Sequence, residues 1–109
     1  MIYTDCYFAV LKKFKEQYPN AIFELIMRRF NHPLSPSWKL LTRAKTEGWS
    51  FSKYKVEFLK ELNKRKDAKE KLKELKEISR EHDLFLICFE KDASVCHRSI
   101  IKELLEKMT

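Results

Sequence analysis

The chain has 109 residues, of which 44% are hydrophobic and 36% charged, and it carries a formal net charge of +7. This composition excludes an intrinsically disordered chain, and no apolar run is long enough for a membrane span or for the apolar core of a signal peptide. We therefore expect one compact domain over residues 1–109, located in the cytoplasm and without a membrane partner.

The first part of the chain reads as a strand, a helix and a second strand. Residues 1–10 are rich in β-branched, aromatic and other apolar types, which predicts a β-strand. Residues 11–18 place apolar side chains at helical spacing, and Pro19 ends this predicted helix. Residues 21–27 form a nearly continuous apolar run, which indicates a second, buried strand.

The middle of the chain predicts a loop followed by two capped helices. Residues 28–38 contain two prolines and several short polar residues, a composition typical of a loop. Ser37 is placed to cap a short helix, which Gly48 ends. Ser50 or Ser52 then caps a longer helix that has one apolar face.

The last part of the chain predicts a helix, a strand and a helix. Residues 63–82 form a highly charged helix whose polar side is best explained as a solvated face. Residues 84–89 are the most apolar run, which indicates a central strand covered on both faces, and Ser94 or the adjacent turn starts the last helix. Strands that alternate with helices predict a small three-layer α/β domain with a short, mostly parallel sheet flanked by helices.

Reactive side chains gather where the last predicted strand meets the last predicted helix. Cys88 and Glu90 fall at the carboxyl end of the strand, where open α/β sheets bind ligands, and strand alternation sends both to one face. Cys96, His97 and Arg98 fall near the start of the helix. Free backbone N–H groups and the macrodipole at this end favour an anion and lower the pKa of a cysteine thiol.

Four interpretations of this segment are open. Cys96 can be a nucleophile with His97 or Glu90 as proton carrier, or Arg98 and the helix N-terminus can grip an anion without catalysis. Cys88 and Cys96 can instead form a structural or redox-active disulfide. A zinc site made of the two cysteines and a histidine is the least favoured, because the spacing matches no common ligand pattern. We therefore expect no metal and no cofactor.

The cysteine count and the charge distribution limit the surroundings of this segment. The chain has three cysteines, and an odd number argues against the disulfide framework of a secreted protein. The Lys/Glu-rich composition is typical of hyperthermophiles, however, and intracellular disulfides occur in those organisms. Residues 83–109 carry four Lys/Arg against five Asp/Glu, so the excess of basic residues lies in the rest of the chain. These basic residues either bind nucleic acid or an anionic ligand, or only keep the protein in solution. We interpret Trp38 and Trp49 as core anchors rather than as platforms for base stacking.

Three segments of the chain resemble a known family, the domain-of-unknown-function 488 family. Residues 86–101, with their Cys-Phe-Glu-Lys-Asp turn and following Cys-His-Arg-Ser, resemble the family's signature. Residues 34–41 resemble its Leu-Ala-Pro-Ser-x-x-Leu-Leu segment, and residues 49–54 resemble its Trp-x-x-Tyr helix entry. The resemblance extends over roughly residues 25–105 in the family's order.

The resemblance implies a small α/β domain and a set of site residues. The residues that match the family's motif positions are Cys88, Glu90, Cys96, His97 and Arg98. Ser35, Pro36 and Ser37 would lie nearby, and one of Arg28 and Arg29 would match an Arg that the family has after its second strand. The family has no established activity, and its Cys and His residues have led to the suspicion that it is enzymatic.

Our hypothesis from the sequence is a thiol-dependent enzyme that acts on an anionic, nucleotide-like or nucleic-acid substrate. Cys96 attacks, Glu90 and His97 move protons, and Cys88 belongs to the same catalytic group. Arg98 holds negative charge together with Arg28 or Arg29, and Ser37 also binds the anion. The alternative is a non-catalytic module that binds nucleic acid or another anion, in which Cys88 and Cys96 are structural or redox-active.

Overall fold

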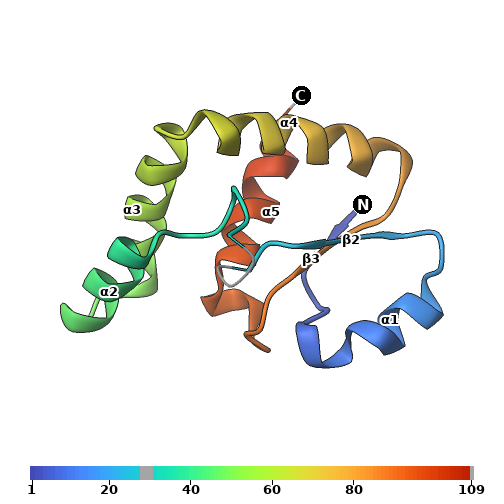
Figure 1. Cartoon of the computed structure of the whole chain (residues 1–109), viewed down its shortest axis with the longest axis horizontal. Helices are drawn as coiled ribbons and strands as arrows, with labels where there is room; N and C mark the ends of the chain where they lie inside the picture. Colours follow the sequence, from blue (N-terminus) through green and yellow to red (C-terminus); the bar gives the residue numbers. More distant parts are fainter. Residues whose placement is uncertain (28–30, 109) are drawn as a thin grey trace.

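The computed structural model describes residues 1–27 and 31–108 and shows a small three-layer α/β fold (Figure 1). The sheet is parallel, with β3 between β1 and β2. The strands are β1 (Ile2–Tyr3), β2 (Ile22–Leu25) and β3 (Leu84–Ile87). The predictions of a short parallel sheet and of a central last strand are confirmed.

Five α-helices surround this sheet in the described residues. They are α1 (Leu11–Gln17), α2 (Trp38–Thr46), α3 (Phe51–Asn63), α4 (Lys66–Glu81) and α5 (His97–Lys107). As predicted, the Ser37 and Ser50 side chains accept hydrogen bonds from the first turns of α2 and α3, and Gly48 follows α2 with a positive φ of 62°. None of these helices is long and apolar enough to cross a bilayer.

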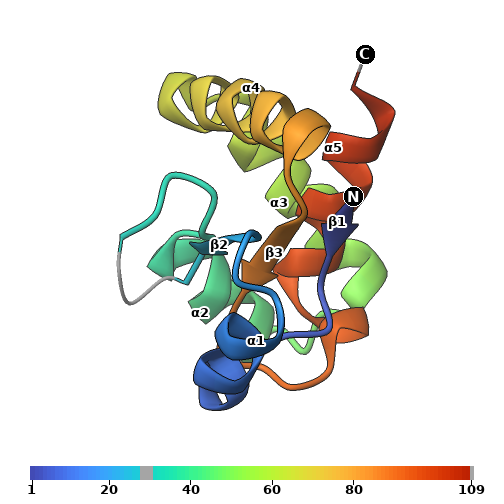
Figure 2. The same cartoon turned by 90° about the vertical axis from the view of Figure 1, so that its right-hand side faces the viewer.

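Strict alternation along β3 separates the two sides of the core. Leu84 and Leu86 belong to the larger cluster, which the helices α2 to α5 complete, whereas Phe85 and Ile87 belong to a smaller cluster against α1. Figure 2 shows α1 on one side of the sheet and α4 and α5 on the other. All four β3 side chains are buried, as expected for a central strand covered on both faces.

The N-terminal strand is much shorter than predicted. Only Ile2 and Tyr3 pair with β3, and the chain then leaves the sheet and forms a 3₁₀ turn at Phe8–Val10, so a strand over residues 1–10 is wrong. The carbonyl oxygens of Thr4 and Cys6 accept hydrogen bonds from a buried guanidinium at 2.9 and 2.7 Å. A side chain from the far end of the chain therefore replaces the backbone partner that a longer strand would need.

The last two helices also begin later than expected. The charged helix starts at Lys66 rather than at residue 63, because Lys64 and Arg65 connect it to α3. Ser94 lies in a 3₁₀ turn, Ala93–Val95, and α5 begins only at His97, with Cys96 as its N-cap. This arrangement places the start of α5 next to the carboxyl ends of β2 and β3.

Candidate functional site

Two thiols and an imidazole meet at the carboxyl end of the sheet. Cys88 directly follows β3, Cys96 is the N-cap of α5, and His97 is its first residue. Their ligand atoms all lie within 4.8 Å of one another. Cys96 and His97 are buried and Cys88 is half-buried. The structure thus brings together three of the residues that the sequence analysis selected.

The hydrogen bonds of His97 determine which ring nitrogen carries the proton. Nε2 lies 2.6 Å from the backbone oxygen of Ile26, just after β2, and a carbonyl oxygen can only accept. Nε2 is therefore protonated, and in the neutral ring Nδ1 is the acceptor. This Nδ1 lies 3.6 Å from the Cys96 sulfur, so it is placed to receive the thiol proton. The ring of His97 also packs edge-on against Phe58, with the ring centroids 5.9 Å apart.

The two cysteines of the cluster have very different pKa values. Hydrogen bonding from the Cys88 thiol, then from the backbone N–H of Arg98, together with the charge of Arg98, lowers the pKa of Cys96 to about 6. The same contact with Cys96, followed by burial, raises the pKa of Cys88 to about 12. The pair therefore keeps one proton at neutral pH, with the thiolate on Cys96 and the thiol on Cys88.

The position of Cys96 in the fold agrees with this assignment. The N-cap residue of an α-helix faces free backbone N–H groups and the positive end of the macrodipole, which stabilise a thiolate. Cys6 provides the contrast, because it is fully buried in the cluster on the other face of the sheet. Burial raises the pKa of Cys6 to about 11.

Arg98 is occupied by the protein's own backbone. Its side chain is fully buried, and its terminal nitrogens donate to the carbonyl oxygens of Thr4, Cys6, Glu90 and Lys91. With its terminal N–H groups used in this way, the guanidinium is not presented to a ligand as the sequence analysis expected. The geometry instead favours a role for Arg98 in joining the N-terminal segment to the turn that follows β3.

Ser37 is likewise used inside the fold. Its hydroxyl accepts from the backbone N–H of Leu40 at 3.1 Å and donates to Glu61 at 2.5 Å, while its own N–H donates to the other Glu61 oxygen at 2.8 Å. Arg65 donates to Glu61 at 3.3 Å and to the Ser35 carbonyl at 2.9 Å. Ser37 therefore holds the loop against α3, and the geometry does not support the expected anion contact.

This brace predicts a measurable loss of stability when Glu61 is changed. We expect Glu61→Gln to lower the free energy of unfolding by about 1–2 kcal/mol, because the NH2 group that replaces one carboxylate oxygen cannot accept a hydrogen bond from Ser37 and the charge beside Arg65 is lost. Urea unfolding followed by circular dichroism measures the change. The exposed Glu70→Gln on α4 is the matched control, and a Glu61→Gln loss no larger than that of the control contradicts the role assigned to the brace.

The remaining expected site residues lie at the edge of the cluster or outside the described chain. The Glu90 side chain is exposed, and only its backbone oxygen contacts Arg98. Arg28 and Arg29 lie outside the described residues. His32, which was not among the expected site residues, is used within the fold: its Nε2 lies 2.6 Å from Glu24, and its Nδ1 accepts from the backbone N–H of Leu34 at 3.0 Å.

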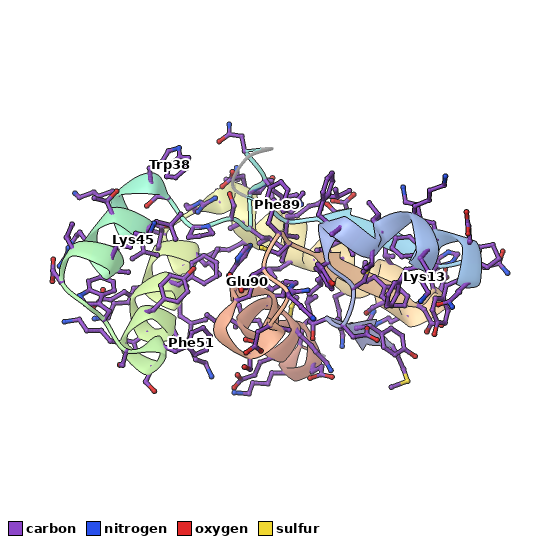
Figure 3. The ribbon with its side chains drawn as sticks, turned by 90° about the horizontal axis from the view of Figure 1, so that it is seen from below. Lys13, Trp38, Lys45, Phe51, Phe89 and Glu90 are labelled. Atoms are coloured by element: carbon purple, nitrogen blue, oxygen red, sulfur yellow. The ribbon has the colours of Figure 1, made fainter. Side chains whose placement is uncertain are left out.

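A cleft of about 1300 Å³ opens from the cluster toward α2 and α3. Besides the thiols, His97 and Glu90, its lining includes Trp38, Lys45, Trp49, Phe51, Tyr54 and Phe89. Trp38 is 63% exposed, so the prediction that it is a core anchor is wrong, whereas Trp49 packs against the larger core cluster. Figure 3 shows Trp38, Lys45 and Phe51 on the side of the molecule formed by α2 and α3, and Phe89 and Glu90 near its middle.

Tyr54 lines the cleft as well, although the resemblance of residues 49–54 to the family's helix entry gave it no role in the site. Burial, followed by the nearby charge of Cys96, raises the pKa of its hydroxyl, so Tyr54 is neutral beside the thiolate. Its ring stacks parallel to that of Phe58, with centroids 5.9 Å apart. The signal that could have identified Tyr54 is its polar tip on an otherwise apolar helix face.

The three converging donor atoms also have the character of a soft-metal ligand set. Two sulfurs and an imidazole nitrogen suit zinc or a similar cation, and the Nε2–H bond to Ile26 is the kind of outer contact that orients such a histidine. Two neighbouring cysteines that share one proton also form a thiol–thiolate pair without any ion. The labelling experiment in the Discussion therefore uses protein treated with a chelator, so that the thiols react without a bound metal.

Comparison with known proteins places this geometry in a family. The family model described as DUF488-N3a, the active DUF488-N3 subclade, matches residues 10–109 and so includes the whole cluster. No curated protein and no solved structure matches the chain.

Proposed function

Because this chain belongs to the domain-of-unknown-function 488 family, in the group described as its active N3 subclade, we propose that it is a thiol-dependent enzyme. The substrate we propose is anionic and either nucleotide-like or part of a nucleic acid, and the nucleophile is Cys96. The observation that carries the proposal is the Cys96 sulfur beside Cys88 and His97 at the buried end of the cleft.

Cys96 and His97 are arranged for attack and proton transfer. The proton that Cys96 loses on ionisation passes to Nδ1 of His97, and the thiolate forms a bond to an electrophilic centre of the substrate as the bond from that centre to its leaving group breaks. The imidazolium Nδ1–H returns the proton to the group that leaves. Throughout, Nε2–H remains bonded to the Ile26 oxygen, so the ring does not need to turn.

Cys88 and Arg98 support the nucleophile in this proposal rather than react. The Cys88 thiol donates its proton toward the Cys96 thiolate, which keeps the sulfur ionised at neutral pH. Arg98 contributes its backbone N–H and its charge, and it fixes the turn between β3 and α5. Both are therefore positioning residues.

Glu90 remains a proposed second proton carrier. Its carboxylate is exposed and lines the cleft, and in the described part of the chain no hydrogen bond joins it to Cys88 or Cys96. A carboxylate in this position acts on a bound ligand or on an attacking water rather than on the thiol itself.

The second candidate function is binding without catalysis. The net charge of +7 favours it, because a basic protein attracts nucleic acid and other polyanions. A binding module requires affinity that falls steeply with salt and that is indifferent to the loss of the Cys96 sulfur.

Replacement of the nucleophile separates the two functions. We expect reduced wild-type protein to turn over at least one substrate in a panel of phosphorylated nucleosides and single-stranded oligonucleotides, and Cys96→Ser to lower that rate by roughly a thousandfold or more. Product formation is followed by chromatography, and Cys6→Ser, which changes a thiol on the other face of the sheet, keeps the wild-type rate. Turnover that survives in Cys96→Ser contradicts the proposal.

A further inference from the structure

The cleft beside Cys96 has a wall of flat aromatic rings. Its lining includes the partly buried rings of Trp49, Phe51 and Tyr54 and the exposed rings of Trp38 and Phe89. Its volume of about 1300 Å³ exceeds that of most small-molecule pockets, which measure roughly 300–1000 Å³. A wall of this kind suits a ligand with a flat ring that can stack, and the space suits a ligand larger than the ring alone.

Several of these rings are exposed to solvent. Trp38 is 63%, Phe89 47% and Phe8 40% exposed, and the rings of Phe8 and Phe89 lie 5.1 Å apart. Large aromatic side chains that gather in solvent mark a binding surface, because water is displaced from them at little cost when a ligand stacks. The exposed rings thus extend the aromatic wall beyond the cleft.

Positive charge collects at the end of the cleft between α2 and α3. Lys45 lines the cleft, is exposed and has no salt bridge within the described residues. The charged groups of Arg43 and Lys53 each lie 5.2 Å from the centre of the Trp49 ring. Glu47 pairs with Arg43 at 3.2 Å and accepts from Trp49 Nε1 at 3.1 Å, so the positive excess here comes from Lys45 and Lys53. Glu90, the carboxylate of the lining, lies apart from Lys45 in Figure 3, so an anionic group of a ligand is drawn toward Lys45.

We propose that the cleft binds a phosphorylated nucleoside, with the base against the exposed ring of Trp38 and the phosphate beside Lys45. Stacking and a cation are the two features with which proteins hold such ligands when they do not read the sequence of bases. The inference names the substrate class of the proposed enzyme and rests on that function only in sharing the cleft of Cys96.

A phosphorylated nucleoside can reach the cleft as a free nucleotide or as part of a single-stranded nucleic acid. Figure 3 shows Lys45 on α2 and Lys13 on α1 on opposite sides of this face, with Phe89 between them. Lys13 does not line the cleft. Only a strand that continues beyond the cleft reaches it, so Lys13 distinguishes the two sources.

Isothermal titration calorimetry on the reduced Cys96→Ser variant tests the assignment without turnover. The ligands are adenosine monophosphate, adenosine, ribose phosphate and a short single-stranded oligoadenylate. We expect adenosine monophosphate to bind at least about fivefold more tightly than either adenosine or ribose phosphate, because each of these lacks one of the two recognised groups. Adenosine monophosphate also slows the alkylation of Cys96 in the wild-type protein.

Variants assign each part of the ligand to its side chain. Trp38→Ala weakens the binding of adenosine monophosphate and adenosine alike, by about fivefold or more. Lys45→Ala weakens adenosine monophosphate and leaves adenosine unchanged, and the matched control Lys69→Ala, an exposed lysine of α4, changes neither. If the source is a strand, Lys13→Ala weakens the oligonucleotide alone; if it is a free nucleotide, Lys13→Ala changes nothing.

The inference and the proposed enzyme fail in different ways. Absence of binding by both adenosine monophosphate and the oligonucleotide, or equal weakening of adenosine and its monophosphate by Lys45→Ala, overturns the nucleotide assignment. Cys96 that still alkylates rapidly in the same preparation then leaves the thiol-dependent function standing. Tight nucleotide binding together with an unreactive Cys96 supports the nucleotide assignment and contradicts the thiol-dependent function.

Discussion

Replacing Arg98 with alanine lowers the free energy of unfolding by about 3–5 kcal/mol, the largest loss that we expect from any single change to this site. The side chain is fully buried, and its removal leaves four backbone carbonyl oxygens, those of Thr4, Cys6, Glu90 and Lys91, without the guanidinium. For a domain of this size each kcal/mol corresponds to a change in Tm of roughly 4–8 °C, so thermal unfolding followed by circular dichroism is sensitive enough.

Two further variants test the same prediction even if Arg98→Ala does not fold. Arg98→Lys retains a buried cation but cannot reach all four carbonyl oxygens, so we expect an intermediate loss of stability and a higher pKa for Cys96. Arg80→Ala removes an exposed arginine that is paired with Glu77 and costs at most about 0.5 kcal/mol. If Arg98→Lys is as stable as Arg80→Ala, the carbonyl contacts do not hold the fold together as described.

Removing the Cys88 thiol raises the pKa of Cys96 by at least about one unit. The Cys88 thiol is the largest contributor to the lowered pKa of Cys96, since it donates a hydrogen bond to the ionised form only. In Cys88→Ala this donor is lost, whereas in Cys88→Ser a hydroxyl replaces it. The pH at which the Cys96 alkylation rate reaches half of its plateau therefore moves upward in Cys88→Ala and stays near the wild-type value in Cys88→Ser.

This pair of variants separates the hydrogen bond from the space that the side chain fills. Both replacements are of similar size, so a general loosening of the site shifts both profiles together. Cys6→Ala, on the other face of the sheet, provides the baseline. Equal midpoints in Cys88→Ala and Cys88→Ser show that the thiol does not tune Cys96 through hydrogen bonding.

The elements that depend on local pattern could be predicted from the sequence. The apolar run 84–89 contains β3, Ser37 and Ser50 cap the helices expected to follow them, and the alternation of strands and helices yields the parallel sheet. The length of the first strand could not be predicted, because it depends on a guanidinium more than ninety positions away in the chain. No local preference contains that information.

For the site, the sequence indicated which residues meet and was less informative about what they do. The proximity of Cys88, Cys96 and His97 follows from a strand end and a helix start that the sequence places together. The backbone partners of Arg98 and the bond from Ser37 to Glu61 appear only in three dimensions, so both residues read as anion ligands. The exposure of Trp38 depends on how α2 packs against α3, which composition does not indicate.

The central claim is that Cys96 carries a thiolate at neutral pH while the other two cysteines remain protonated. The measurement that tests it most directly is the rate of iodoacetamide labelling at each cysteine across pH. Mass spectrometry follows the labelling on protein that is kept reduced and treated with a chelator, so that neither a disulfide nor a metal ion masks a sulfur.

The account predicts that Cys96 is labelled first and that its rate rises to a plateau with a midpoint near pH 6, the value of its lowered pKa. Cys88 and Cys6, whose pKa values are raised to about 12 and about 11, stay slow at neutral pH. A midpoint for Cys96 at the ordinary thiol value of about 8.5, or labelling of Cys96 no faster than that of Cys88, would contradict the thiolate and with it the proposed enzyme.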